Sequence, residues 1–198
     1  MGNVLTAQIT IEGTRPLLWH AFTPDAIPIG KRERTGTAGN DPAEWRRTVL
    51  ATPTGQLYLK HTYVFGCLRD GAKFTPYRRG TLQPLLVSTL LVLDRVIPID
   101  GLVLPEAPPA DEEQPVYLDV QSVRNPATRA RNVRYRVGAA PGWRATFRIS
   151  WDKTVISREQ LHAIAIDAGR LVGIGDGRAI GYGRFAVAEL HITDDNAA

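Results

Sequence analysis

The chain has 198 residues, of which 43% are hydrophobic and 22% are charged, and this composition is typical of one folded domain rather than a disordered chain. No apolar run approaches the roughly 20 residues that cross a bilayer, and the N-terminus lacks the charged start and apolar stretch of a signal peptide. Because Cys67 is the only cysteine, an intrachain disulfide is excluded. We therefore expect a cytoplasmic protein without a membrane partner.

Residues 3–12 are β-prone and alternate in polarity, which predicts a first strand. Residues 22–44 are rich in Pro, Gly, Thr and charge and show no period, so we expect a long, mobile loop there. We predict an extended segment over residues 56–65 and a short helix that starts at residues 66–73. The apolar residues 85–99 are predicted as a buried strand, with a helix as the alternative. Residues 100–114 are rich in Pro and acids and predict a surface connector.

The clearest strand pattern lies between residues 133 and 151. Apolar side chains alternate with arginines over residues 133–137, and they alternate again with polar and basic side chains over residues 143–151. A period of two with one apolar and one basic face predicts a half-buried sheet. Because Ala140-Pro141-Gly142 is a turn sequence, we predict that these two strands form a β-hairpin with each other.

The C-terminal part begins with Ser157 and Gln160, which form a capping box that opens a helix. A last strand is predicted over residues 185–192. The order strand, helix, strand, strand, helix, strand predicts an α+β fold with a ferredoxin-like (RRM-like) β-α-β-β-α-β core, an inserted hairpin and long loops. The helical residues expected to be buried are Leu161, Ile164, Ala165, Ala168, Leu171 and Val172.

Basic residues are unevenly distributed in this chain of net charge +4. Residues 120–151 contain no acid, whereas acids cluster at residues 111–113 and 194–195. A segment with only positive charges, in a chain that carries both kinds of charge, indicates a surface for polyanions. A solvated strand face would give the same pattern. The seven arginines of this segment are Arg124, Arg129, Arg131, Arg134, Arg136, Arg144 and Arg148.

A glycine-rich segment joins the last helix to the last strand. Glycine permits positive φ and lets backbone N–H groups approach a phosphate closely. Arg178 and Arg184 add guanidinium groups that suit phosphate oxygens, and Tyr182 can stack on a base or pack in the core. The segment follows a helix and contains no Gly-Lys-Ser/Thr, so it is neither a dinucleotide-binding motif nor a P-loop. A helix C-cap and a tight turn are the simpler alternative. The five glycines are Gly173, Gly175, Gly177, Gly181 and Gly183.

Three segments of the chain resemble a known family. Residues 175–185, which end Gly181-Tyr182-Gly183-Arg184-Phe185, resemble the C-terminal glycine-rich loop of the RAMP superfamily, the RNA-binding subunits of CRISPR effector complexes. Residues 57–69 resemble the segment in which a strand of the type III backbone subunits turns into the first helix. Residues 125–134 and 141–147 resemble their thumb-like hairpin region and the strand after it. Thr62-Tyr63-Val64-Phe65 replaces the serine pair of the family, so the chain resembles a divergent member.

The resemblance implies one RAMP-like nucleic-acid-binding domain over residues 1–198, with residues 100–142 as an insertion that forms the thumb. Such subunits polymerise along a guide RNA in complexes that defend against foreign nucleic acid. The implied partners are single-stranded guide RNA, target RNA or DNA, further copies of the chain and other effector subunits. The candidate nucleic-acid-binding residues are Lys60, Arg69, Lys73, Arg129, Arg131, Arg134, Arg136, Arg178, Gly181, Tyr182, Gly183 and Arg184.

Two other functions remain open. A related branch of the superfamily processes guide precursors by general acid–base chemistry, and for such a metal-independent endoribonuclease His20 would be the general acid or base. Target cleavage by a carboxylate after the first strand would fall to Asp25 or Asp41. The chain could instead be a structural subunit of a phage or mobile-element assembly. We assign no catalytic residue.

No metal or cofactor is expected, because the histidines lie far apart in sequence and no pair has ligand spacing. Cys67 lies at a predicted helix N-terminus, which could lower the pKa of its thiol. The alternative is a small, buried side chain.

Overall fold

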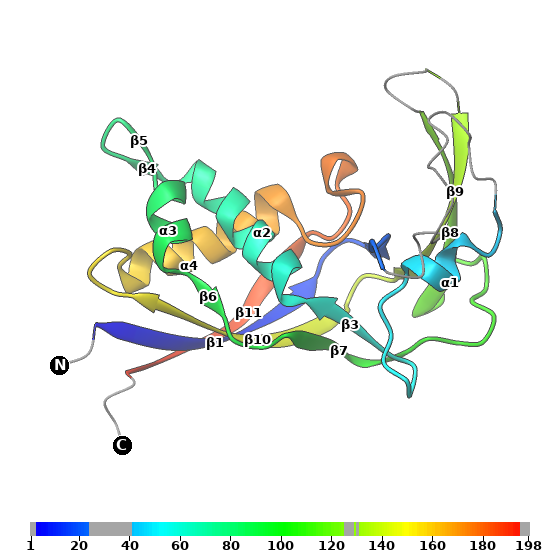
Figure 1. Cartoon of the computed structure of the whole chain (residues 1–198), viewed down its shortest axis with the longest axis horizontal. Coiled ribbons are helices and arrows are strands. Elements are labelled where there is room, and N and C mark those ends of the chain that lie inside the picture. The colour runs from blue at the N-terminus through cyan, green and yellow to red at the C-terminus, as the bar shows by residue number, and fades with distance from the viewer. Residues whose placement is uncertain (1–2, 24–40, 125–128, 130, 195–198) are drawn as a thin grey trace, which may run out of the picture.

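The computed structural model describes residues 3–23, 41–124, 129 and 131–194, and it combines helices with antiparallel β-sheets (Figure 1). The α+β class is therefore confirmed. The largest sheet has the strand order β11-β1-β10-β7-β3, with β6 paired to β10, and each neighbouring pair is antiparallel. Its strands are β1 (Val4–Gly13), β3 (Gln56–Lys60), β6 (Leu91–Val92), β7 (Val96–Val103), β10 (Arg144–Asp152) and β11 (Phe185–Asp194).

The first and last predicted strands are confirmed as β1 and β11, and they pair with each other. Alternate residues of β1, such as Ile9 and Ile11, are buried, whereas Gln8 and Glu12 are exposed. Because side chains of a strand point alternately to the two faces, one face of the sheet carries the core and the other faces solvent.

Three helices cover the apolar face of this sheet: α2 (His61–Gly71), α3 (Gln83–Thr89) and α4 (Arg158–Asp167) (Figure 1). The predicted capping box opens α4, because the Ser157 hydroxyl accepts a hydrogen bond from the Gln160 amide at 3.2 Å and the Ser157 amide donates to the Gln160 side chain at 2.9 Å. A π turn (Ala168–Val172) follows α4. Its wider turn shifts the helical register, so Leu171 is 40% exposed rather than buried as predicted.

A second sheet stands at one end of the molecule (Figure 1). Its order is β2-β9-β8, with β2 (Leu17–Trp19), β8 (Val116–Arg124) and β9 (Arg131–Ala139). The short helix α1 (Glu44–Thr48) contacts β9. The indole N–H of the buried Trp19 donates to the Tyr58 carbonyl at 2.9 Å, which ties β2 to β3 of the main sheet. A third, minimal sheet pairs β4 (Pro76–Tyr77) with β5 (Gly80–Thr81).

The predicted hairpin between residues 133–137 and 143–151 is wrong. Both segments are strands, but β9 pairs with β8 and β2, whereas β10 pairs with β1, β6 and β7. The turn between them carries the chain from one sheet to the other: the Gly142 amide donates to the Gly13 carbonyl and the Gly13 amide to the Trp143 carbonyl, each at 2.7 Å. An alternating pattern specifies a strand and its faces but not its partner.

Three other boundaries differ from the prediction. The chain is extended only to Lys60, and α2 begins at His61, five residues before the predicted helix start. Residues 85–99 do not form one strand: they begin in α3 and continue into β6 and β7. Pro84 lies in the first turn of α3, where proline is tolerated. The predicted loop over residues 22–44 lies largely outside the described residues, and its last residue begins α1. No described helix combines the length and apolar character that crossing a bilayer requires.

A buried ionic network joins β8 and β9 of the second sheet to the glycine-rich segment (residues 173–184). Arg136 of β9 is 4% exposed, and its guanidinium donates to the Asp119 carboxylate of β8 at 2.7 and 2.9 Å and to the Asp176 carboxylate at 2.9 Å. The side-chain amide of Gln121 donates to the Asp119 carboxylate at 2.7 Å and to the Tyr182 hydroxyl at 2.5 Å. Burial by itself lowers the pKa of Arg136, but the bonds to Asp176 and Asp119 outweigh it and raise this pKa above its ordinary value.

We predict that Arg136→Ala lowers the free energy of unfolding by about 3–5 kcal/mol, because it leaves the Asp119 carboxylate buried without a counter-charge. Urea unfolding followed by circular dichroism measures this loss. The matched control is Arg148→Ala, because Arg148 also forms a 2.7 Å ion pair, with Asp94, but is more than half exposed. An exposed pair contributes about 0–1 kcal/mol, so similar losses in the two variants would contradict the structural role of Arg136.

Candidate nucleic-acid interface

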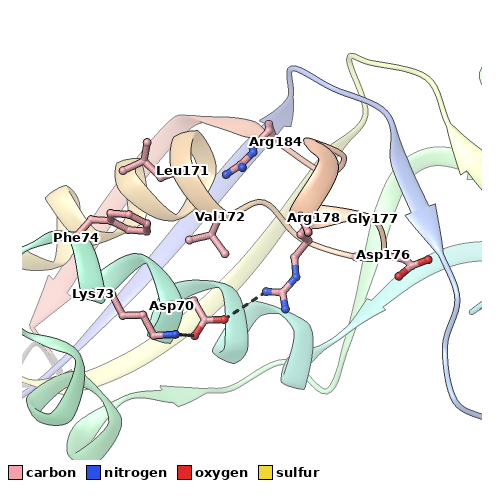
Figure 2. Close-up of a pocket in the computed structure, with 11 residues that line it drawn as sticks. Asp70, Lys73, Phe74, Leu171, Val172, Asp176, Gly177, Arg178 and Arg184 are labelled. Atoms are coloured by element: carbon pink, nitrogen blue, oxygen red, sulfur yellow. Dashed lines mark ion pairs between the residues drawn. The ribbon is translucent and has the colours of Figure 1, made fainter. Parts of the chain in front are cut away.

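A groove of about 610 Å³ lies between the end of α2 and the glycine-rich segment (Figure 2). We call it the α2 groove. A second groove of about 430 Å³ runs along the start of α2, and we call it the His20 groove because His20 lines it. The two grooves share Gly175, Asp176 and Arg178. They therefore form one continuous depression along α2.

Asp70 organises the cations of this depression. Its carboxylate lies 3.1 Å from the Arg69 Nε, 3.0 Å from the Lys73 Nζ and 3.6 Å from an Arg178 terminal nitrogen, and Figure 2 shows the last two pairs. The Asp70 side chain is 16% exposed, whereas that of Lys73 is 52% exposed. Burial alone raises the pKa of Asp70, but hydrogen bonds from Arg69 and Lys73 outweigh it, so this pKa lies below its usual range. One ionised carboxylate thus holds three cations at the rim.

Arg184 supplies a further cation from the opposite wall of the α2 groove (Figure 2). One of its terminal nitrogens is buried and has no hydrogen-bond partner among the described residues. A buried donor without an acceptor costs free energy. Asp176, the second acid of the groove, is already bonded to Arg136, and its carboxylate points away from the groove in Figure 2.

The glycine-rich segment is a compact loop, and we also call it the clamp. All five of its glycines have positive φ. Its backbone amides are largely used inside the protein: Ile174 donates to the Gly183 carbonyl at 2.9 Å, Asp176 to Leu18 at 2.9 Å and Gly183 to Pro16 at 2.7 Å. Sequence reasoning expected amides to approach a phosphate, but these three amides already have acceptors. Arginine side chains rather than these N–H groups therefore face the α2 groove.

The structure brings four of the twelve candidate residues to the two grooves: Arg69, Lys73, Arg178 and Arg184. Lys60 ends β3 just before α2 and is half-buried, and it lines neither groove. Gly183 is buried and Gly181 lies at an open turn, so we assign both a role in shaping the segment. The Tyr182 hydroxyl accepts the hydrogen bond from Gln121.

The remaining candidates lie on β9 or at the tip of the β8–β9 hairpin. Arg136 is buried in its ionic network, and Arg134 is bound to Glu44 at 2.5 Å, so each guanidinium already has an acid partner. Arg129 and Arg131 are exposed at the hairpin tip beside Arg124, and these three form no ion pair with the rest of the described chain.

The positive charge of residues 120–151 is largely neutralised by acids from other parts of the fold. Arg144 lies 3.6 Å from Glu12 and 3.8 Å from Glu189, on the solvent face of the main sheet. Arg148 pairs with Asp94 on the same strand face. For these two arginines the solvated-face interpretation holds, and the unpaired positive charge of the segment is confined to the hairpin tip.

The candidate catalytic residues are dispersed. His20 lies 3.3 Å from Glu44, whose carboxylate also binds Arg134, and it lines a groove with Tyr63 and Arg69. Asp41 pairs with Arg47, and Asp25 lies outside the described residues. Within the part of the chain that the structure describes, no group of three or more His, Cys, Asp or Glu side chains could hold a metal ion.

Sequence reasoning missed the contributions of Asp70 and Phe74 to the α2 groove. Asp70 follows Arg69 directly and precedes Lys73 by three residues, a spacing that places Asp70 and Lys73 on one face of a helix. That spacing could have indicated the cluster. Phe74 is 51% exposed at the groove, and nothing in the sequence distinguishes it from a core aromatic.

No family model and no curated protein matches the sequence. Among solved structures, a chain of the cryo-EM structure of the type III-B Cmr-beta bound to cognate target RNA aligns with a TM-score of 0.48 and 12% sequence identity. The alignment covers 97% of the present chain and 61% of that chain. The present chain thus spans about three fifths of the length of that structural neighbour.

We predict that Gly183→Ala destabilises the protein more than Gly181→Ala. Both glycines have positive φ, at 67° and 97°, so alanine costs about 1–2 kcal/mol at either site. At Gly183 a Cβ would also lie 1.7 Å from the Ile174 carbonyl oxygen, whereas nothing lies within 4 Å at Gly181. Urea unfolding of the two variants checks this order, and equal losses would contradict the described packing of the clamp.

We predict that Cys67 is unreactive in the native protein. It lies inside α2 rather than at its N-terminus, and burial raises the pKa of its thiol to about 12. At about pH 8 only about one thiol in 10,000 is then ionised, and the thiolate is the nucleophile. Labelling with Ellman's reagent should be slow in the native chain and fast in guanidinium chloride. Fast labelling without denaturant would contradict the burial of Cys67.

Proposed function

We propose that this chain is an RNA-binding subunit whose α2 groove and His20 groove hold the sugar–phosphate backbone of a single strand. The observation that carries the proposal is the gathering of Arg69, Lys73 and Arg178 around the ionised Asp70, with Arg184 on the opposite wall of the α2 groove. A positive groove that follows a backbone, with an aromatic side chain beside it, is typical of sequence-tolerant single-strand binding. Phe74 is the exposed aromatic residue of this groove.

The solvent face of the main sheet is a poorer candidate for the RNA. RRM-type sheets bind bases through exposed aromatic residues in the central strands. Here the outward residues of β1 and β10 are polar except for Val4, none is aromatic, and Thr10 and Thr146 bond each other across the strands at 3.0 Å. The arginines of this face are already paired with acids. We therefore place the RNA on the side of the helices and the glycine-rich segment.

We further propose a ferredoxin-like core of β1, α2, β7, β10, α4 and β11 in chain order. The spatial order β11-β1-β10-β7, with both helices on one face, supports this arrangement (Figure 1). In this proposal the β8–β9 hairpin is the thumb-like element of residues 100–142, and its exposed tip contributes Arg129 and Arg131. The chain would coat a guide RNA as one of several copies in a CRISPR-type effector complex.

Binding of a fluorescein-labelled single-stranded RNA, followed by anisotropy at several salt concentrations, tests the proposal. Affinity should fall steeply with salt. Arg178→Ala should weaken binding about fivefold, a loss of about 1 kcal/mol, and lower the salt slope by about 0.7 for one lost phosphate contact. The matched control is Arg144→Ala, which removes the same charge from the opposite face of the sheet and should leave the affinity within about twofold.

The absence of RNA binding at low salt would contradict the proposal and favour a structural subunit of a phage or mobile-element assembly. Equal weakening of RNA binding by Arg178→Ala and Arg144→Ala would contradict the groove as the RNA-binding site. A supporting observation would be nucleic acid that co-purifies with the chain and is digested by RNase but not by DNase.

One observation favours a second candidate, a metal-independent endoribonuclease. His20 is oriented by Glu44 at 3.3 Å in a groove that also contains Tyr63 and Arg69, so a general acid–base group would lie beside phosphate-binding cations. Wild-type protein would then cleave a hairpin RNA in the presence of EDTA, and His20→Ala would abolish cleavage but retain binding. A wild-type protein that binds the hairpin and leaves it intact would exclude this activity.

A further inference from the structure

A third cleft, of about 510 Å³, meets the α2 groove at Arg184. Its cations are Arg15, Arg170 and Arg184, and no acidic residue lines it. We call it the three-arginine cleft. Neither Arg15 nor Arg170 was among the candidates from the sequence, because Arg15 follows the first predicted strand and Arg170 lies on the polar side of the predicted helix.

Backbone contacts bring these three arginines together. The amides of Thr14 and Arg15 both donate to the Arg184 carbonyl, at 2.8 and 3.2 Å, which joins the end of β1 to the start of β11. The Trp143 indole N–H donates to the Arg15 carbonyl at 2.9 Å. Gly169 packs so closely on β11 that a Cβ would lie 2.3 Å from the Phe185 carbonyl oxygen, and this contact places Arg170 beside the strand. The arrangement is therefore built into the fold.

The charges of the cleft are uncompensated. Arg15 and Arg170 are exposed, and neither pairs with an acid elsewhere in the described residues. Arg184 brings the buried nitrogen that lacks an acceptor. Three guanidinium groups around one cleft repel one another unless an anion lies between them. Phosphate is the anion that suits them, because its oxygens accept paired guanidinium N–H bonds.

Shared residues connect the hollows around the glycine-rich segment. Arg184 belongs to both the α2 groove and the three-arginine cleft, and Arg15 belongs to this cleft and to a further hollow of about 370 Å³ lined by Ile180, Gly181 and Tyr182. A basic path therefore runs from α2, past Arg184, to the far edge of the clamp. A chain of phosphates could follow this path, whereas a single small anion would fill only one hollow.

We propose that Arg15, Arg170 and Arg184 form a second phosphate-binding site that continues the path of the RNA beyond the α2 groove. This inference rests on the proposed RNA binding and extends its footprint to residues that the family resemblance does not indicate. The exposed Ile166 and the half-buried Val187 provide apolar contact for ribose or base beside the phosphates.

The test compares two double variants of equal charge. Arg15→Ala/Arg170→Ala empties the cleft of its exposed cations and leaves Arg184 in place. Arg144→Ala/Arg148→Ala removes two cations from the solvent face of the main sheet. The probe is a labelled oligouridine of about 16 nucleotides, the upper range of site sizes for single-strand binding domains. The cleft variant should bind at least about tenfold more weakly, with a salt slope smaller by about 1.4 for two lost phosphates, whereas the control should change less than about threefold.

The possible outcomes separate the two proposals. If Arg178→Ala weakens binding but the cleft variant matches the wild type in affinity and salt slope, the three-arginine cleft is rejected and the α2 groove stands. Equal weakening by the two double variants would show a general charge effect and also reject the cleft. A wild-type protein that does not bind the oligouridine would reject both proposals. Unchanged thermal unfolding of each variant verifies that the fold is intact.

Discussion

The candidate interface depends on the ion pairs that the buried Arg136 guanidinium forms. Because this cation is removed from water, it requires both Asp119 on β8 and Asp176 in the glycine-rich segment as partners. The pairing fixes the hairpin against the segment and occupies the Asp176 carboxylate with a cation outside the α2 groove. Arg178 and Arg184 face a groove that both Asp70 and Asp176 line. An arginine that resembles an RNA contact in sequence is therefore a buried residue that holds the hairpin to the glycine-rich segment.

Charge has a different distribution in space from its distribution along the chain. The arginines of β10 meet the acids Glu12 of β1, Glu189 of β11 and Asp94 of the β6–β7 connection, so their charges are offset on the solvent face of the sheet. Three cations without an acid partner in the described residues, Arg15, Arg170 and Arg184, lie around the glycine-rich segment, and three more lie at the hairpin tip. Long-range attraction of a polyanion follows the net charge of a surface, so the proposed RNA is placed on the side of the segment rather than on the open sheet.

Patterns in the sequence predicted the elements that short-range interactions determine. Features that depend on tertiary packing were not predicted. The alternation in β1 and the capping box of α4 are short-range signals, and both elements form as expected. The predicted hairpin of β9 with β10 was wrong, because β9 pairs instead with β8, the strand just before it in the chain, and with the distant β2. In the site, residue type and spacing indicated Arg178 and Arg184. The burial of Arg136 and the meeting of Arg15 with Arg170 follow only from tertiary packing.

The measurement that tests the central claim most directly is photo-crosslinking of 4-thiouridine RNA to the purified chain, with the modified peptides identified by mass spectrometry. A single strand held along α2 and the glycine-rich segment should crosslink to peptides around Phe74 and Tyr182. The same RNA should leave the solvent-facing residues of β1, β10 and β11 unmodified. Crosslinks concentrated on those strands, with none around Phe74 or Tyr182, would contradict the account.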